Sequence, residues 1–199
     1  MYIILSAMPW AENHKAETRG RILDAAAAAF RAEGVDAIAV GEIMSRAGLT
    51  HGGFYAHFAS KEQLVAEALR HASRQTTRKF DRTAESAGAD ALRAVIDSYL
   101  DAAHVAHPER GCVVAALGPE AARGPRAVKV SLGQSIRARL DRLRRLLPAS
   151  LPTRARDKKA AGVFACMVGG LILARGLQRE ESEQLLADCR AFLEDALAG

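Results

Sequence analysis

The sequence has few aromatic residues and few β-branched alternating stretches, and it has no long hydrophobic run. Aromatic side chains make up only 5% of the 199 residues, and the scarcity of alternating β-branched runs favours packed helices over strands. The apolar run Val163–Leu173 is about half the length that a membrane-spanning helix needs. It therefore predicts a buried helix, and the composition as a whole predicts an all-α fold without a membrane partner.

Motifs for metal binding, redox chemistry and catalysis are also missing. The three cysteines are far apart and form no CxxC pair or metal-ligand cluster. An odd number of cysteines indicates a reducing, cytoplasmic compartment, and the apolar segment Met1–Met8 is too short for a signal peptide. The sequence from Met8 onward reads like a natural start. Because there is no nucleophile elbow, P-loop or dinucleotide fingerprint, we expect no enzyme, no cofactor and no metal.

What the sequence does contain is apolar residues at helical spacing. An apolar residue recurs every four residues from Ile22 to Phe30, and Gly34 is a natural end for that helix. Ser60–Gln63 has the pattern of a capping box that opens a longer helix. The polar segment Asp81–Asp90 is expected to be a loop. About nine helices are predicted, over residues 18–33, 40–46, 51–57, 61–80, 91–106, 112–122, 126–147, 154–177 and 182–198.

The most specific pattern lies between Glu42 and Phe58, where two short helical segments flank Gly48. This arrangement predicts a helix-turn-helix, with glycine at a left-handed turn position. Leu49, Phe54 and Phe58 are expected to face inward, which turns the following residues outward: Thr50, His51, Gly52, Tyr55 and His57. Two consecutive glycines within a helix cost about 1 kcal/mol each relative to alanine. Such a pair indicates close approach of the backbone to another surface, for which a DNA groove is one candidate.

From about Thr18 to Leu69 the sequence resembles the DNA-binding domain of the tetracycline-repressor-like (TetR) family. The stretch AGLTHGGFYAHFASKEQL is similar to the family's third helix and the start of its fourth. The resemblance implies a DNA-binding domain at residues 15–62 and a helical ligand-binding and dimerisation domain at residues 63–199. It further implies a ligand-responsive transcriptional regulator that acts as a repressor. Such a protein is a homodimer that binds a palindromic double-stranded operator and releases it when a small-molecule effector binds.

Roles for individual residues follow from the same resemblance. Base edges are the expected partners of Thr50, His51 and Gly52. Phosphates are the expected partners of Tyr55, His57 and Lys61, the lysine standing at a helix N-terminus that itself favours an anion. The family commonly has Thr or Ser where this sequence has Ile38 and Ala39. Two alternatives to a DNA-binding regulator are a helical interaction module without DNA binding and an enzyme on the same fold.

The basic residues are concentrated outside the helix-turn-helix. Residues 1–75 hold eight basic and eight acidic side chains, whereas residues 123–159 hold twelve basic residues and only Asp141 and Asp157 in opposition. The leucines of residues 126–147 form one stripe, with the arginines expected outside it. The segment Arg137–Arg145 is interpreted either as a solvated helix face or as an electrostatic funnel for an anionic ligand or DNA.

A ligand pocket is predicted within residues 91–177, mostly apolar, with Tyr99, His104 and Gln134 near it. Cys112 has two interpretations, a small buried hydrophobe or a thiol that senses oxidants or electrophiles. It follows Arg110 and Gly111 at an expected helix N-terminus, where a thiolate is favoured, and this context resembles that of some electrophile-responsive TetR-like regulators. The other two cysteines, Cys166 and Cys189, are expected to be inert. The last two helices stay apolar over wide faces and are expected to form a dimeric four-helix bundle.

Overall fold

The computed structural model describes residues 9–198, with the side chains described from residue 13 onward. The expected start at Met8 lies outside the described residues. Within that range the chain is all helical, with nine α-helices, three short 3₁₀ helices and no strand. The all-α prediction is therefore confirmed. Among the same residues there is also no helix with both the length and the apolar character that crossing a membrane requires.

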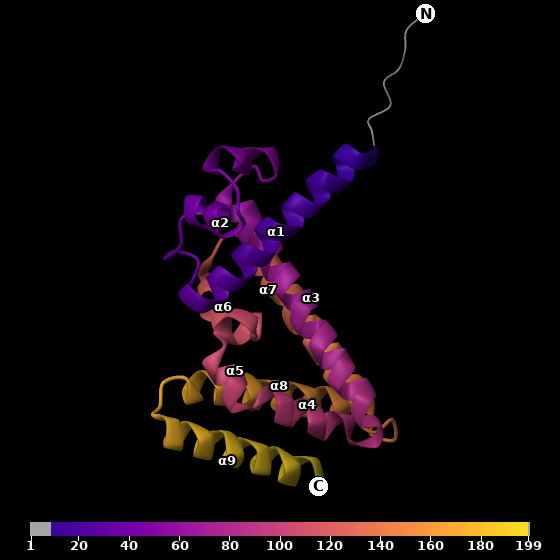
Figure 1. Ribbon diagram of the computed structural model, residues 1–199. Helices are drawn as coiled ribbons and strands as arrows, with labels where there is room; N and C mark the ends of the chain where they lie inside the picture. The colour runs from indigo at the N-terminus through magenta and orange to yellow at the C-terminus, as the bar shows by residue number, and fades with distance from the viewer. Residues whose placement is uncertain (1–8, 199) are drawn as a thin grey trace, which may run out of the picture.

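The helices lie at two levels joined by a pair of long helices (Figure 1). The first level holds α1 (Pro9–Glu33), α2 (Val40–Arg46) and η1 (His51–Ala56). The second holds α4 (Ala91–Tyr99), α8 (Thr153–Ala174) and α9 (Arg179–Ala198). Between them run α3 (Lys61–Ala87) and α7 (Arg126–Leu146), which pack against each other. The remaining elements are η2 (Gly88–Asp90), α5 (Ala102–Ala106), η3 (Pro108–Arg110) and α6 (Val113–Arg123).

Each level has its own hydrophobic core. The first core joins the inner faces of α1, α2 and η1 to the start of α3, and it includes residues from α6 and the start of α7, such as Leu117 and Leu132. The second core joins the end of α3 to α4 and α7–α9 around Leu100, Leu143 and Met167, which are almost fully buried. Like α3 and α7, α6 contributes to both cores, with Val113 and Leu117 in the first and Ala115 in the second.

The helix that begins at Lys61 extends further than predicted. Ser60 Oγ accepts a hydrogen bond from Gln63 N at 3.1 Å, which confirms the predicted serine cap. The Gln63 side chain reaches back as predicted, but its Oε1 accepts from Ala59 N at 2.7 Å, one residue before the N-cap residue of a standard capping box. The predicted loop at Asp81–Asp90 is wrong, because the helix continues to Ala87. Residues 81–87 are polar but include no helix breaker, and Asp81 is held by Arg142 of α7. The helix ends only at Gly88, whose φ of 55° is left-handed.

The predicted helix over residues 91–106 is interrupted. It divides into α4 and α5 at Leu100, which has φ −88° and ψ 59°, outside the helical region. Asp101 then caps α5, its Oδ1 accepting a hydrogen bond from Ala103 N at 2.8 Å. Apolar spacing continues through this break, so periodicity alone does not reveal it. The break places Tyr99 and His104 next to each other, which matters for the cavity described below.

Candidate nucleic-acid interface and effector cavity

The turn between α2 and η1 has the geometry that the sequence predicts. Gly48 has a φ of 70°, and its N–H donates to Ser45 O at 2.9 Å. The following helix is shorter and tighter than expected, because residues 51–56 form a 3₁₀ helix and not an α-helix. Its hydrogen bonds include Gly53 N to Thr50 O at 3.1 Å and His57 N to Phe54 O at 2.9 Å. Both are i to i+3 bonds, and two consecutive glycines give the segment little preference for the α-form.

This 3₁₀ helix is fixed from behind by aromatic side chains. Phe54 and Phe58 are each only 1% exposed, and their rings stack with centroids 5.7 Å apart. Leu49 packs against the same core. With these three inward, as predicted, the outward face is formed by residues that are exposed: Thr50, His51, Gly52 and Tyr55. Tyr55 is 72% exposed, so this large aromatic side chain lies in solvent while the buried rings of Phe54 and Phe58 pack behind it.

The outward residues differ in how free they are. No side-chain hydrogen bond caps η1 through Thr50. The His51 ring lies against α2, since a Cβ added to Gly41 would be 3.1 Å from His51 Nδ1. A Cβ added to Gly52 would meet no atom within 4 Å, and the φ of Gly52 is not positive. Neither internal packing nor backbone strain therefore explains glycine at position 52.

Lys61 already has a partner within the protein. Its Nζ donates to Ile38 O at 2.8 Å, at the segment that precedes α2. Ile38 is 1% exposed, and Ala39 makes no side-chain cap at the start of α2. The lysine therefore helps to position a helix that lacks a capping hydroxyl. An ammonium group has three N–H donors, so two are left for another acceptor.

His57 lies in a basic environment that the sequence alone does not reveal. Burial lowers the pKa of His57, and the nearby cations of Lys15 and Arg19 lower it further. Its Nδ1 is buried without a hydrogen-bond partner among the described residues. Arg19 lies over the Phe58 ring at 4.6 Å and pairs with Glu67 at 2.5 Å. Lys15 and Arg19 belong to α1, so only the tertiary structure brings them to the helix-turn-helix.

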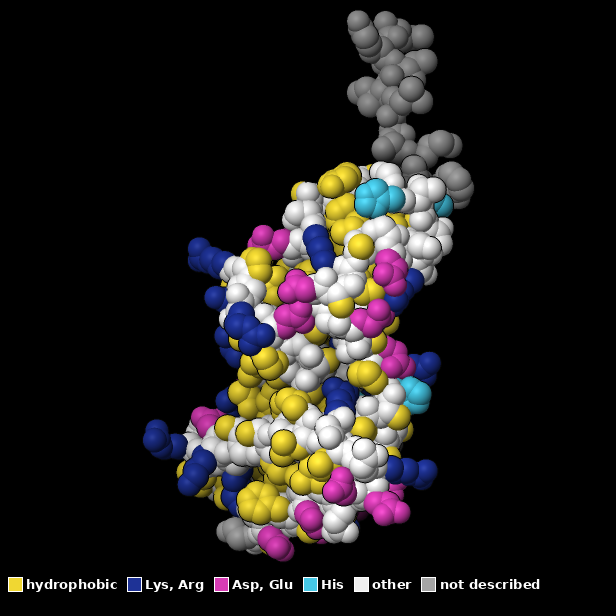
Figure 2. All heavy atoms as spheres, turned by 90° about the vertical axis from the view of Figure 1, so that its left-hand side faces the viewer, with side chains coloured by type: hydrophobic (Ala, Val, Ile, Leu, Met, Phe, Trp, Pro, Cys, Tyr) yellow, Lys and Arg dark blue, Asp and Glu magenta, His cyan; other side chains and the backbone are white. Residues whose placement is uncertain are grey.

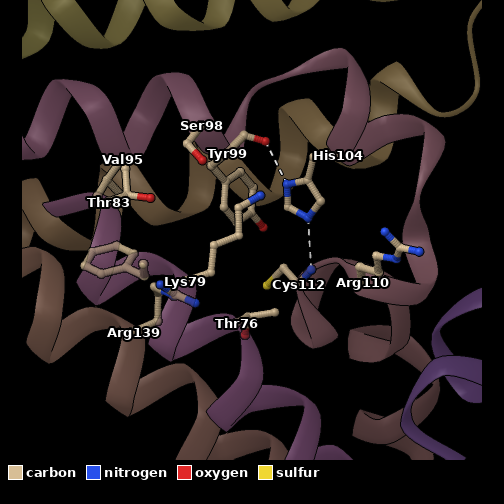
Figure 3. Close-up of a pocket in the computed structure, with 11 residues that line it drawn as sticks. Thr76, Lys79, Thr83, Val95, Ser98, Tyr99, His104, Arg110, Cys112 and Arg139 are labelled. Carbon is tan, nitrogen blue, oxygen red and sulfur yellow. Dashed lines mark hydrogen bonds between the residues drawn. The ribbon is translucent and has the colours of Figure 1, made fainter. Parts of the chain in front are cut away.

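The second level contains a small cavity of about 50 Å³ lined by residues of α3, α4, α5, η3 and α7 and by Cys112 at the head of α6 (Figure 3). Two of the three predicted pocket residues, Tyr99 and His104, line it, as does Cys112. The third, Gln134, is exposed and lies outside the lining. It stands two positions after Leu132 on α7, which places it on the opposite side of that helix. Residues of α3, among them Lys79 and Phe80, were missed because they precede the segment expected to form the pocket.

A chain of hydrogen bonds crosses one wall of the cavity. The Tyr99 carbonyl accepts from His104 Nδ1 at 2.8 Å, and Cys112 N donates to His104 Nε2 at 3.0 Å (Figure 3). This pattern requires a neutral imidazole with its proton on Nδ1. Burial lowers the pKa of His104 to about 4, although its bond to Tyr99 opposes this; the cations of Arg175, Lys79 and Arg139 lower it further. Cys112 is 4% exposed and immediately precedes α6.

Arg31 connects this wall to the first level. It lies near the end of α1, is 6% exposed, and donates to Ala27 O at 2.8 Å, Gly111 O at 3.0 Å and Gln75 Oε1 at 3.0 Å. Burial lowers the pKa of Arg31 to about 10. The residue that it holds, Gly111, directly precedes Cys112. The head of α6 is therefore joined to α1 by a buried hydrogen bond.

The basic segment of α7 is not uniformly an outer face. Arg137 and Arg145 are exposed, and Arg144 pairs with Asp141 at 3.0 Å and Asp157 at 2.5 Å. Arg139, in contrast, is 6% exposed and lines the cavity. The expectation that the arginines lie outside is wrong for this residue. Arg139 follows Leu132 by seven positions and precedes Leu143 by four, which places it on the apolar stripe.

The two remaining cysteines come together although they are far apart in the sequence. Cys166 Sγ lies 4.0 Å from the carbonyl oxygen of Cys189, and both side chains are half-buried between α8 and α9. Burial, together with the neighbouring Cys189, raises the pKa of Cys166 to about 11. A thiol with so high a pKa is a poor nucleophile at neutral pH.

The last two helices expose apolar side chains. On and after α8, Ile172 is 43%, Leu173 61% and Leu177 43% exposed; on α9, Phe192 is 65% exposed. The prediction of a buried helix at residues 163–173 is therefore right for one face only. Figure 2 shows hydrophobic side chains gathered over the lower part of the face that it displays.

Comparison with known proteins gives similarities in both sequence and fold. A sequence model of bacterial regulatory proteins of the tetR family matches residues 22–68. The HTH-type transcriptional regulator SrpR of Pseudomonas putida is 39% identical over 88 residues, which cover 44% of this chain and 40% of SrpR. The HTH-type transcriptional repressor KstR2 of Mycobacterium tuberculosis is 48% identical over 52 residues, 26% of each chain. The matches thus span less than half of either relative.

A solved structure extends the similarity to the C-terminal helices. The crystal structure of a TetR transcriptional regulator from Chloroflexus aurantiacus superimposes with a TM-score of 0.75 at 26% identity, covering 91% of this chain and 94% of that one. The order of helices is therefore that of TetR-type proteins over nearly the whole length.

Proposed function

The chain is TetR-like in its helix-turn-helix and in its fold, and on that premise we propose that it is a ligand-responsive, DNA-binding transcriptional regulator, a repressor and not an enzyme. The observation that supports this best is the outward face of η1. Tyr55 and its neighbours are exposed while Phe54 and Phe58 behind them are buried. A rigid polar face of this kind suits a major groove. DNA as the partner also implies a cytoplasmic location.

We assign the DNA contacts as the sequence resemblance implies. Thr50, His51 and Gly52 would read base edges, and the open space beside Gly52 allows its backbone to approach the groove. Tyr55, His57 and Lys61 would bind phosphates, Lys61 with the two N–H donors that Ile38 leaves unused. The DNA-binding unit proposed on this basis is residues 15–62, with residues 63–199 forming the ligand-binding and dimerisation unit.

The proposed active form is a homodimer through α8 and α9. Exposed Leu173 and Phe192 are the type of large apolar side chain that a helix bundle buries. Two copies related by a twofold axis would present two η1 segments about 34–36 Å apart, or a multiple of that, to a palindromic double-stranded operator. The expected result is a dimer in sedimentation at micromolar concentration, which Phe192→Glu converts to a monomer.

We propose that the cavity beside Tyr99 and His104 is where a small-molecule effector acts. A ligand that displaces the His104–Cys112 wall would move the head of α6, and Arg31 would carry that movement to α1. An electrophile that adds to Cys112 would act at the same point. Alkylation is then expected to release operator DNA from the wild type and not from Cys112→Ser. An equal response of the two proteins would leave Cys112 a packing residue.

The function is tested by fluorescence anisotropy with the DNA upstream of the protein's own gene, scanned as overlapping duplexes. We expect saturable binding to one palindromic duplex, two chains per site, that weakens as salt increases. Binding to no duplex above the level of unrelated DNA would favour an interaction module instead.

A further inference from the structure

Arg139 is a buried cation without a counter-ion. Its side chain is 6% exposed and stacks on Phe80, with Cζ 4.5 Å from the ring centroid. Among the residues that the structure describes, it makes no ion pair and no hydrogen bond. The carboxylate of Asp81 belongs to Arg142, which donates to it at 2.9 Å and 3.3 Å. Stacking leaves the five N–H donors of a guanidinium unused, and burying a charge without an opposite charge is unfavourable.

The same cavity holds a second polar group without a partner. The hydroxyl of Tyr99 is buried and makes no hydrogen bond within the described chain, and the side chain is 7% exposed. Burial first, and Cys112 second, raise the pKa of Tyr99 well above its ordinary value. The phenol therefore stays protonated and can donate.

The remaining lining residues strengthen the positive character of the cavity. Lys79 lines it together with Arg139, and none of its lining residues is acidic. Arg110 also lies at the lining, but its side chain is 83% exposed and pairs with Glu109 at 3.5 Å. Figure 3 shows Lys79 extending toward Tyr99. Lys79 and Arg139 would repel a cationic ligand, and a neutral ligand would leave Arg139 unpaired. The apolar part of the lining comes from Phe80 and Val95, with hydroxyl groups from Thr83 and Ser98.

We propose that this cavity is a carboxylate subsite, in which a small organic acid pairs with Arg139 and accepts a hydrogen bond from the Tyr99 hydroxyl. A carboxylate matches the planar fork of a guanidinium with two parallel hydrogen bonds, and one of its lone pairs remains for the phenol. A volume of about 50 Å³ accommodates several water-sized groups, each of which needs roughly 10–15 Å³. The acid is thus a compact one with a short aliphatic or aromatic group beside Phe80. This inference rests on the proposed function only in naming the acid as the effector.

The first test is calorimetric titration of the DNA-free protein with acetate, butyrate and benzoate. Benzamide, a neutral analogue of benzoate, and sulfate are titrated alongside. We expect at least one carboxylate to bind, benzamide and sulfate to bind far more weakly, and Arg139→Gln to weaken the carboxylate by about 30-fold or more. Arg137→Gln, which changes an exposed arginine of the same helix, should bind as the wild type does. Equal binding of every carboxylate by wild type and Arg139→Gln, absence of carboxylate binding, or equal binding of sulfate would overturn the assignment.

A second variant separates a ligand-binding arginine from a structural one. If Arg139 serves an absent anion, Arg139→Met removes an unpaired buried charge and should leave the Tm of the ligand-free protein unchanged or higher, while abolishing its increase on adding the carboxylate. A lower Tm with ligand response retained would make Arg139 a structural partner of Phe80 and refute the proposal. The proposed function is read separately. Carboxylate binding without operator release supports the subsite and contradicts the role of the acid as effector. Operator release by a neutral compound alone supports the proposed function and contradicts the carboxylate as its effector.

Discussion

The two levels of this protein place polar side chains on opposite sides of their helices: the first exposes them to solvent and the second buries them around a cavity. In the helix-turn-helix the aromatic residues Phe54 and Phe58 close the interior, and Tyr55 is held in solvent. Around the cavity the arrangement is inverted, because Tyr99 and Arg139 are buried and point toward an internal space. A surface with its polar groups outside suits a large external partner, and a cavity with its polar groups inside suits a small ligand. The contrast therefore supports two different binding roles for one chain.

The largest effect is expected where the interior of the first level is opened. Phe54→Ala should lower the free energy of unfolding by about 3–5 kcal/mol, because the ring is 1% exposed within a closed core. The neighbouring change Tyr55→Ala, at an exposed residue, should alter stability by no more than about 0.5 kcal/mol and still weaken DNA binding. Urea denaturation and anisotropy titrations measure both. A Tyr55→Ala variant that is strongly destabilised would contradict the separation of support and contact.

A smaller effect is expected from the pH dependence of the second level. In the unfolded chain His104 becomes protonated below pH 6.5, whereas in the folded chain it stays neutral until the pH reaches its lowered pKa of about 4. The stabilisation is therefore complete above pH 6.5 and is lost as the pH falls toward 4, by up to about 3 kcal/mol. His104→Gln keeps an acceptor for Cys112 N and removes the titration. The free energies of unfolding of the wild type and of His104→Gln, measured by urea denaturation, should therefore differ less at pH 4 than at pH 6.5. A difference that is constant with pH would contradict the buried neutral imidazole.

The smallest effect is expected at Lys61, which has an internal hydrogen bond to Ile38 and a proposed contact with a DNA phosphate. Lys61→Ala should lower the slope of log K against log salt by about 1 per subunit and weaken all DNA sequences similarly. Loss of its bond to Ile38 should cost about 1 kcal/mol of stability. Lys129→Ala, an exposed lysine on α7, serves as the matched control. If both variants keep the wild-type slope, Lys61 positions α2 and does not bind phosphate.

How well the sequence predicts each level follows from the same contrast. The helix-turn-helix is local, so the glycine at position 48 and the spacing of Phe54 and Phe58 are enough to predict which side faces outward. Even there, the 3₁₀ form of residues 51–56 and the approach of Lys15 to His57 depend on tertiary packing. Sequence similarity supplies the proposed contacts, and spacing supplies the orientation.

The cavity is assembled from separate helices, and the sequence predicts less of it. Polar composition suggested a loop at residues 81–90, although a long helix can be polar where it faces solvent. The break at Leu100 is invisible in the apolar spacing, yet it brings Tyr99 to His104. Tyr99, His104 and Cys112 were predicted from the sequence, whereas Arg139 was expected on the outer face although it stands on the stripe of leucines. Its lack of a counter-ion depends on Asp81 being held by Arg142, a contact across 61 positions.

The most direct test of the outward face as a DNA-binding surface is a pair of substitutions at Gly52. A side chain there meets no protein atom within 4 Å of its Cβ, and the backbone does not require glycine. Gly52→Ala and Gly52→Leu should therefore leave the Tm and the sedimentation of the protein unchanged. Measured by anisotropy on the palindromic duplex, affinity should fall modestly for alanine and be lost for leucine. A Gly52→Leu protein that binds the operator as tightly as the wild type would contradict the account.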